Sequence, residues 1–168
     1  MSEKVNVLMV CLGNICRSPT AEGVLKAKLA QAGLADKVFV DSAGTGSWHI
    51  GNAPDKRATR AALARQYDLS EIRARQVTSE DFPRFDYIFA MDQQNLQDLF
   101  TMSEPHFHHR ISLFLELGDG EEKEVPDPYY SGADGFEQVL DLIENAADNF
   151  IAELAEISTL SSNSPRQE

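Results

Sequence analysis

The fold is decided by the segment Lys4–Ser18, which reads KVNVLMVCLGNICRS. Its first half, Lys4–Cys11, is a short apolar run rich in valine, typical of a strand buried in a parallel sheet. A short loop follows, and Ser18-Pro19 has the form of a helix N-cap with proline in the first turn. The segment therefore predicts a strand, a tight loop and a helix, with Cys11 at the carboxyl end of the strand.

The rest of the chain repeats this alternation. Short apolar runs predict further strands at Val38–Ser42, Tyr87–Met91 and Ile111–Leu115. Helical spacing and capping signals predict helices near residues 19–32, 54–67, 79–85, 92–102 and 134–157. We therefore predict an α/β fold: a single domain, over residues 1–158, with a four-stranded parallel sheet flanked by helices on both faces. The polar residues 159–168 are expected to form a flexible tail.

Composition and charge limit the partners. The 168 residues are 42% hydrophobic and 25% charged, as in a soluble globular domain. Residues 1–115 hold thirteen basic and thirteen acidic side chains, so the net charge of −12 lies wholly in residues 116–168. Such a surface repels nucleic acid and anionic membranes, and we expect neither as a partner. Two closely spaced cysteines and no secretion signal predict free thiols and a cytoplasmic location.

The loop between the first strand and the first helix has the form Cys-x5-Arg. Glycine and asparagine tolerate positive φ, so the loop can wrap a small cup. Its successive backbone amides, together with the helix dipole, would bind an anion there. The pattern thus predicts a phosphate-binding loop after the first strand, formed by Leu12, Gly13, Asn14, Ile15, Cys16 and Ser18.

A thiol at the centre of this cup would have a lowered pKa, so we expect Cys11 to be a thiolate and a nucleophile toward phosphorus. Arg17 adds a planar fork that can bind two phosphoryl oxygens. A nucleotide-binding loop would instead need Gly-Lys-Ser/Thr where this chain has Cys16-Arg17-Ser18. For Cys16 two interpretations stay open: a small buried residue, or a partner that captures oxidised Cys11 and makes the protein redox-sensitive.

Four separated motifs carry a resemblance to a known family. They are VCLGNICRSPTAEGV, DSAGTGSWHIGNAPD, FDYIFAMDQQNL and VPDPYY, in this order. In these motifs the chain resembles the low molecular weight protein tyrosine phosphatase family. The resemblance implies hydrolysis of phosphomonoesters through a cysteinyl-phosphate, with no metal and no cofactor. It assigns catalytic roles to three residues: the nucleophile Cys11, the phosphate-binding Arg17 and the general acid Asp127. It also implies that Ser42 supports the loop through Asn14.

The reaction itself also requires an acid. A phenol has a pKa of ~10, so its oxygen should be protonated as the bond to phosphorus breaks. We predict that Asp127, which precedes Pro128 in a loop, is this acid. Asp92 is the second candidate because it lies at the carboxyl end of a strand, and its alternative role is to cap the helix that follows. We predict an aromatic substrate wall made of Trp48, Tyr129 and Tyr130; the alternative for Trp48 is a side chain that covers the edge of the core. The four histidines have no carboxylate or cysteine at metal spacing, so we predict no metal site.

One position departs from the family pattern. Many eukaryotic members have a histidine where this chain has Ile72, and that histidine joins the network that supports the loop. The bracing of the loop must therefore differ in this chain.

Three other functions stay open beside a protein tyrosine phosphatase. An arsenate reductase of the same fold needs further cysteines, and this chain has none after Cys16. A protein-arginine phosphatase has threonine at the position of Ile15, and an apolar side chain suits an aryl ring better. A non-catalytic phosphate-binding module would not need Cys11, Arg17 and Asp127 together. We therefore expect a phosphotyrosyl protein or a small aryl phosphate as the substrate, and we make no prediction of the oligomeric state.

Overall fold

A computed structural model describes residues 4–128 and 132–163 of the chain. Four parallel strands form one sheet in the order β2-β1-β3-β4. The strands are β1 (Val5–Cys11), β2 (Val38–Gly44), β3 (Tyr87–Ala90) and β4 (Ile111–Leu113). The helices described are α1 (Arg17–Gln31), α2 (Lys56–Ala64), α3 (Asp81–Arg84), α4 (Gln93–Met102) and α5 (Ala133–Asn163), with short 3₁₀ helices η1 (Pro105–Arg110) and η2 (Phe114–Leu117). The predicted parallel α/β fold is confirmed.

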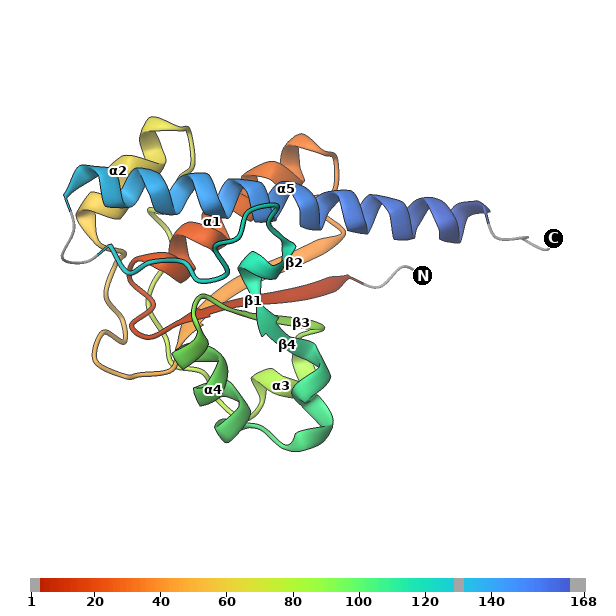
Figure 1. Ribbon diagram of the computed structural model, residues 1–168, viewed down its shortest axis with the longest axis horizontal. Helices are drawn as coiled ribbons and strands as arrows, with labels where there is room; N and C mark the ends of the chain where they lie inside the picture. The colour runs from red at the N-terminus through yellow and green to blue at the C-terminus, as the bar shows by residue number, and fades with distance from the viewer. Residues whose placement is uncertain (1–3, 129–131, 164–168) are drawn as a thin grey trace.

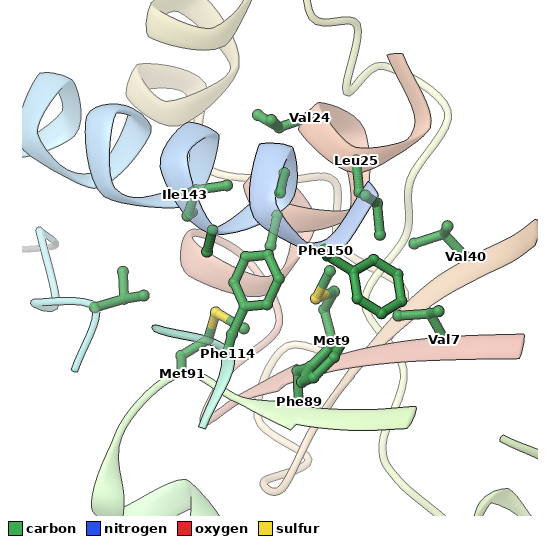
Figure 2. Packing of buried hydrophobic residues seen from close by; sticks show 14 of the residues in the cluster. Val7, Met9, Val24, Leu25, Val40, Phe89, Met91, Phe114, Ile143 and Phe150 are labelled. Atoms are coloured by element: carbon green, nitrogen blue, oxygen red, sulfur yellow. The ribbon is translucent and has the colours of Figure 1, made fainter. Parts of the chain in front are cut away.

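Helices cover both faces of the sheet, as Figure 1 shows, with α1, α2 and α5 on one side and α3 and α4 on the other. The alternation of side chains along β1 explains this arrangement. Val7 and Met9 belong to the core under α1 and α5, which Figure 2 shows from close by. Leu8 and Val10 point to the opposite core, together with apolar side chains of α3 and α4. Because β1 is buried on both faces, its sequence is an apolar run rather than an alternating pattern.

Helix α1 begins at Arg17, two residues earlier than a Ser18 cap would place it. Its N-cap is Cys16, whose side chain makes no capping hydrogen bond, and Ser18 lies inside the first turn. The predicted role of Ser18 as the helix cap is therefore wrong. Its hydroxyl instead lies 3.0 Å from the sulfur of Cys11.

Other boundaries differ from the predictions as well, among them the ends of β4 and α5. Strand β4 ends at Leu113, because Phe114 and Leu115 turn into η2 while staying buried, so the apolar run continues past the strand. Helix α5 continues to Asn163, so that residues 159–163, expected in the tail, are helical. In Figure 1 the last turns of α5 extend beyond the sheet. Among the described residues, no helix is both long and apolar enough to cross a membrane.

The strand order places the chemistry at one edge of the sheet. Cys11 is the last residue of β1, and it is paired in register with Gly44 at the end of β2. Asp92 follows the neighbouring strand β3 as the N-cap of α4. Since the strands are parallel, these positions meet at the same carboxyl edge, where ligands of such sheets bind.

Candidate active site

Several carbonyl groups of the loop between β1 and α1 accept backbone hydrogen bonds from neighbouring segments. Three amides donate to these carbonyls: Thr45 to Cys11 at 2.9 Å, Gly46 to Leu12 at 2.9 Å and Asp55 to Ile15 at 2.8 Å. Within residues 4–128 and 132–163, the backbone amides of Gly13, Ile15 and Cys16 have no hydrogen-bond acceptor. Because these three carbonyls are occupied and these three amides are not, the loop is suited to an anion.

The tight path of the loop depends on two residues. Asn14 has φ 58°, in the left-handed region that asparagine tolerates better than most residues. Gly44 allows the close approach of β2, since a Cβ there would lie 2.7 Å from the carbonyl oxygen of Leu12. Gly13 does not have a positive φ, so the left-handed turn rests on Asn14 alone within this loop.

Buried side-chain hydrogen bonds fix Asn14. Its Nδ2 donates to Ser18 Oγ at 2.9 Å and to Ser42 Oγ at 3.0 Å, and its Oδ1 accepts the backbone N–H of Arg75 at 3.0 Å. The structure therefore brings Ser42 to Asn14, as the resemblance implied. Ile72, the position of the missing histidine, packs instead against the hydrophobic core.

Glu22 ends this network and was not among the predicted site residues. It accepts a hydrogen bond from Ser42 Oγ at 2.6 Å on one oxygen and from Lys26 Nζ at 2.5 Å on the other. The residue is 4% exposed. Burial raises the pKa of Glu22, although the hydrogen bonds from Lys26 and Ser42 oppose that shift. Its pairing with Lys26 four residues later is also typical of a surface helix, so the sequence gives no sign of its burial.

Cys11 and Cys16 are both buried free thiols with different surroundings. The sulfur of Cys11 lies 3.3 Å from the backbone nitrogen of Asn14, which donates to it, and 3.0 Å from Ser18 Oγ. Both groups are placed so that they can donate a hydrogen bond to that sulfur. Burial, reinforced by the charge of Asp55, raises the pKa of Cys16 to about 12, so Cys16 remains a thiol at neutral pH. It packs with apolar side chains of α2 and α5.

Arg17 is buried and held by two groups outside the loop. Its Nη1 donates to Asp92 Oδ2 at 2.7 Å and to the carbonyl of Val125 at 3.0 Å, and its Nη2 lies 3.9 Å from Asp127 Oδ2. Burial alone would lower the pKa of Arg17, but the charge on Cys11 and the bond to Asp92 outweigh it and raise that pKa. The guanidinium is therefore a fixed positive charge beside the cup.

The two candidate acids occupy different places. Asp92 uses one oxygen to cap α4, accepting the N–H of Asn95 at 2.8 Å, and the other to bind Arg17. Asp127 is about half exposed at its side chain and lines the same cavity as Cys11. Asp92 thus caps its helix, which was its alternative role, while Asp127 lines the cavity.

The cavity above the loop has a volume of about 360 Å³. Its lining consists of Cys11, Leu12, Gly13, Ile15, Cys16, Arg17, Trp48, His49 and Asp127. The structure thus brings Trp48 to the wall of the cavity, with 71% of the residue exposed. The two predicted wall residues Tyr129 and Tyr130 lie outside the described residues. Over the described part of the chain, no three His, Cys, Asp or Glu side chains are placed to hold a metal ion.

His49 lines the cavity and was not among the predicted site residues. Its ring covers Gly13, where an added Cβ would lie 3.0 Å from the ring carbon Cδ2. The only available signal was its position directly after Trp48.

Comparisons with known proteins agree with this geometry. A model of the low molecular weight phosphotyrosine protein phosphatase family matches residues 6–159. The low molecular weight phosphotyrosine protein phosphatase of Schizosaccharomyces pombe is 41% identical, with 92% of this chain and 100% of that protein covered. The low molecular weight protein-tyrosine-phosphatase YfkJ of Bacillus subtilis is 41% identical, with 89% and 96% covered.

Solved structures give the same result. A protein tyrosine phosphatase of Entamoeba histolytica, with Hepes in its active site, is 40% identical and has a TM-score of 0.89, with 92% of this chain and 99% of that chain covered. Wzb of Vibrio vulnificus, in complex with benzylphosphonate, is 30% identical with a TM-score of 0.78, and 89% and 98% are covered.

Proposed function

The chain belongs to the low molecular weight phosphotyrosine protein phosphatase family, and we propose that it hydrolyses phosphotyrosyl proteins and small aryl phosphates through a cysteinyl-phosphate. One observation carries the proposal: Cys11, Arg17 and Asp127 line a single cavity at the carboxyl edge of the sheet. The complex of the relative Wzb with benzylphosphonate, an aryl compound with a phosphonate group, supports an aryl substrate.

In the first step, the thiolate of Cys11 attacks phosphorus and the bond from phosphorus to the phenolic oxygen breaks. Arg17, fixed by Asp92 and Val125, binds phosphoryl oxygens and follows their charge into the transition state. Asp127 gives its proton to the leaving oxygen, so that a neutral phenol departs.

In the second step, water attacks the phosphorus of the cysteinyl-phosphate while the carboxylate of Asp127 takes a proton from that water. The bond from sulfur to phosphorus breaks, and inorganic phosphate forms. Ser18 Oγ, 3.0 Å from the sulfur, is placed to donate to the departing thiolate of Cys11. The same hydrogen bond stabilises the thiolate for the next cycle.

The surroundings of the cup favour an aryl group over the guanidinium of phosphoarginine. The apolar side chains of Ile15 and Trp48 both line the cavity, and a flat ring packs against such surfaces. Two free thiols fit a reducing compartment, and we propose a cytoplasmic location.

The test is turnover of para-nitrophenyl phosphate and phosphotyrosine by the purified protein with a metal chelator present. We expect both to be hydrolysed, and phosphoarginine to be hydrolysed far more slowly. Tight binding of inorganic phosphate without any turnover would instead indicate a binding module. Reduction of arsenate, or faster hydrolysis of phosphoarginine, would assign the chain to one of the other functions of this fold.

A further inference from the structure

A second cavity adjoins the catalytic one and shares a wall with it. Its volume is about 360 Å³. Its lining consists of Leu12, Thr45, Gly46, Trp48, Asp98, Thr101 and Met102. Leu12 and Trp48 line both cavities, so the two cavities are neighbours on either side of these side chains.

The position of Trp48 between the cavities is built into the loop after β2. Gly46 leaves room for the indole, because a Cβ at that position would come within 1.9 Å of the ring. The backbone of Gly46 is itself tied to the cup through its hydrogen bond to the carbonyl of Leu12. The indole therefore rests on a surface whose place is fixed relative to Cys11.

The second cavity presents apolar side chains to the solvent. Leu12, Trp48 and Met102 are among the most exposed large hydrophobic residues of the described chain, at 43%, 71% and 38%. Exposed apolar side chains that gather beside a catalytic cavity are typical of a surface that binds part of a substrate. Thr101 adds the only uncharged polar side chain among the lining residues from α4.

The single charged side chain of this cavity is acidic. Asp98 lines it from α4, and its Oδ1 accepts a hydrogen bond from Gln94. An acidic side chain of a ligand would therefore be repelled here by Asp98. An apolar or basic side chain would not.

From this shared wall, the exposed apolar side chains and the charge of Asp98, we propose that one phosphotyrosyl peptide fills both cavities. Its phosphotyrosine enters the cup, and a bulky apolar side chain within two residues of the phosphotyrosine packs against Leu12, Trp48 and Met102. This inference rests on the proposed function and adds the class of substrate: phosphotyrosine sites flanked by an apolar residue and not by an acidic one.

The test uses phosphotyrosine peptides in a glycine and serine background. Leucine, alanine, glutamate or lysine is placed in turn at each of the two positions on either side of the phosphotyrosine. We expect one position at which leucine raises kcat/KM about five- to tenfold over alanine, because a side chain is partly buried there. At the same position, glutamate should lower kcat/KM below the value for alanine.

Two variants locate the effect. Met102→Glu should abolish the preference for leucine, and Asp98→Asn should relieve the discrimination against glutamate, while hydrolysis of free phosphotyrosine stays within about twofold of wild type. Leu63→Glu is the matched control, since Leu63 is also exposed but lies on α2 and lines neither cavity. It should leave both preferences intact.

The outcomes separate the two proposals. Hydrolysis of free phosphotyrosine with equal kcat/KM for leucine, alanine and glutamate at every position would overturn the flanking site and leave the proposed function standing. A preference for leucine that survives Met102→Glu would also overturn it, because the side chain would then bind elsewhere. Failure to hydrolyse phosphotyrosine at all would remove both.

Discussion

The two aspartates beside Arg17 differ in where they lie, because Asp92 caps α4 and Asp127 lines the catalytic cavity, and this difference gives a prediction at the scale of single residues. A proton donor matters more as the leaving oxygen becomes more basic. Asp127→Ala should therefore slow phosphotyrosine hydrolysis by ~10²–10⁴-fold and para-nitrophenyl phosphate much less. The measurement is the pre-steady-state burst, which isolates the first chemical step from hydrolysis of the intermediate.

Asp92→Asn is the control for that experiment. It weakens the hold on Arg17 without removing a proton donor from the cavity, so it should slow both substrates to a similar degree. If Asp92→Asn alone shows the dependence on the leaving group, then Asp92 is the acid and the assignment to Asp127 is wrong.

The second residue prediction concerns Cys16. Because its pKa is raised to about 12, Cys16 stays a thiol at neutral pH, so we expect the proposed nucleophile Cys11 to be the first target of peroxide. The sulfenic acid formed on Cys11 can then condense with the Cys16 thiol to a disulfide, releasing water. We expect Cys16→Ser to keep near wild-type activity under reducing conditions.

Treatment with peroxide should distinguish the wild type from Cys16→Ser by whether the loss of activity is reversible. Wild-type enzyme should be inactivated and then recover with dithiothreitol, whereas Cys16→Ser should lose activity irreversibly. Mass spectrometry of the wild type should show a linked Cys11–Cys16 peptide. Sulfonic acid on Cys11 of the wild type, with no linked peptide, would refute this protective role.

Single residues also show where reading the sequence succeeds. Cys11, Arg17 and Trp48 meet at one cavity as expected, because strand ends and a short loop bring them to one edge of the sheet. Glu22 could not be predicted as a member of the site. Its partner Ser42 lies on another strand, and only the packing of α1 over the sheet brings the two together.

At the scale of elements, Glu22 links α1 to β2 and makes the stability of the fold depend on pH. Burial raises the pKa of Glu22 above its ordinary value of 4.5 in the folded state. Protonated Glu22 therefore contributes fully to the free energy of unfolding below pH 4.5, and this contribution is lost as the pH rises through the raised pKa of the folded state. Glu22→Gln should remove this loss, because an amide has no proton to release.

The measurement is urea unfolding of both proteins from pH 4 to pH 8. The stability of wild type should fall relative to Glu22→Gln as the pH rises into the neutral range. Glu156→Gln, which changes an exposed carboxylate on α5, should not alter the profile. Parallel profiles for wild type and Glu22→Gln would contradict the role given to this buried carboxylate.

Element boundaries were predicted well where the apolar pattern ends in a polar loop, and less well elsewhere. Strand β1 ends at Cys11 as expected. By contrast, Phe114 and Leu115 are buried in η2 rather than in β4, since an apolar run records burial and not backbone conformation. The start of α1 was misplaced because Ser18 matches a capping residue but serves the sulfur of Cys11 instead.

At the scale of the whole molecule, the described side chains of α5 become less buried between Phe150 and Ile157. Phe150 is fully buried, Leu154 still packs on the core, and Ile157 is about half exposed. Deletion of residues 158–168 should therefore leave the urea midpoint and kcat/KM for para-nitrophenyl phosphate nearly unchanged. A large loss of stability in the truncated protein would show that the end of α5 contributes to the fold.

The central claim is that phosphate passes through the sulfur of Cys11, and trapping the intermediate tests it most directly. Wild-type protein is mixed with para-nitrophenyl phosphate, denatured rapidly and mapped by mass spectrometry. We predict phosphate on Cys11 in wild type, and none in Cys11→Ser, whose turnover should fall by several orders of magnitude while phosphate still binds. Phosphate on another residue, or turnover by Cys11→Ser above about a hundredth of wild type, would contradict the account.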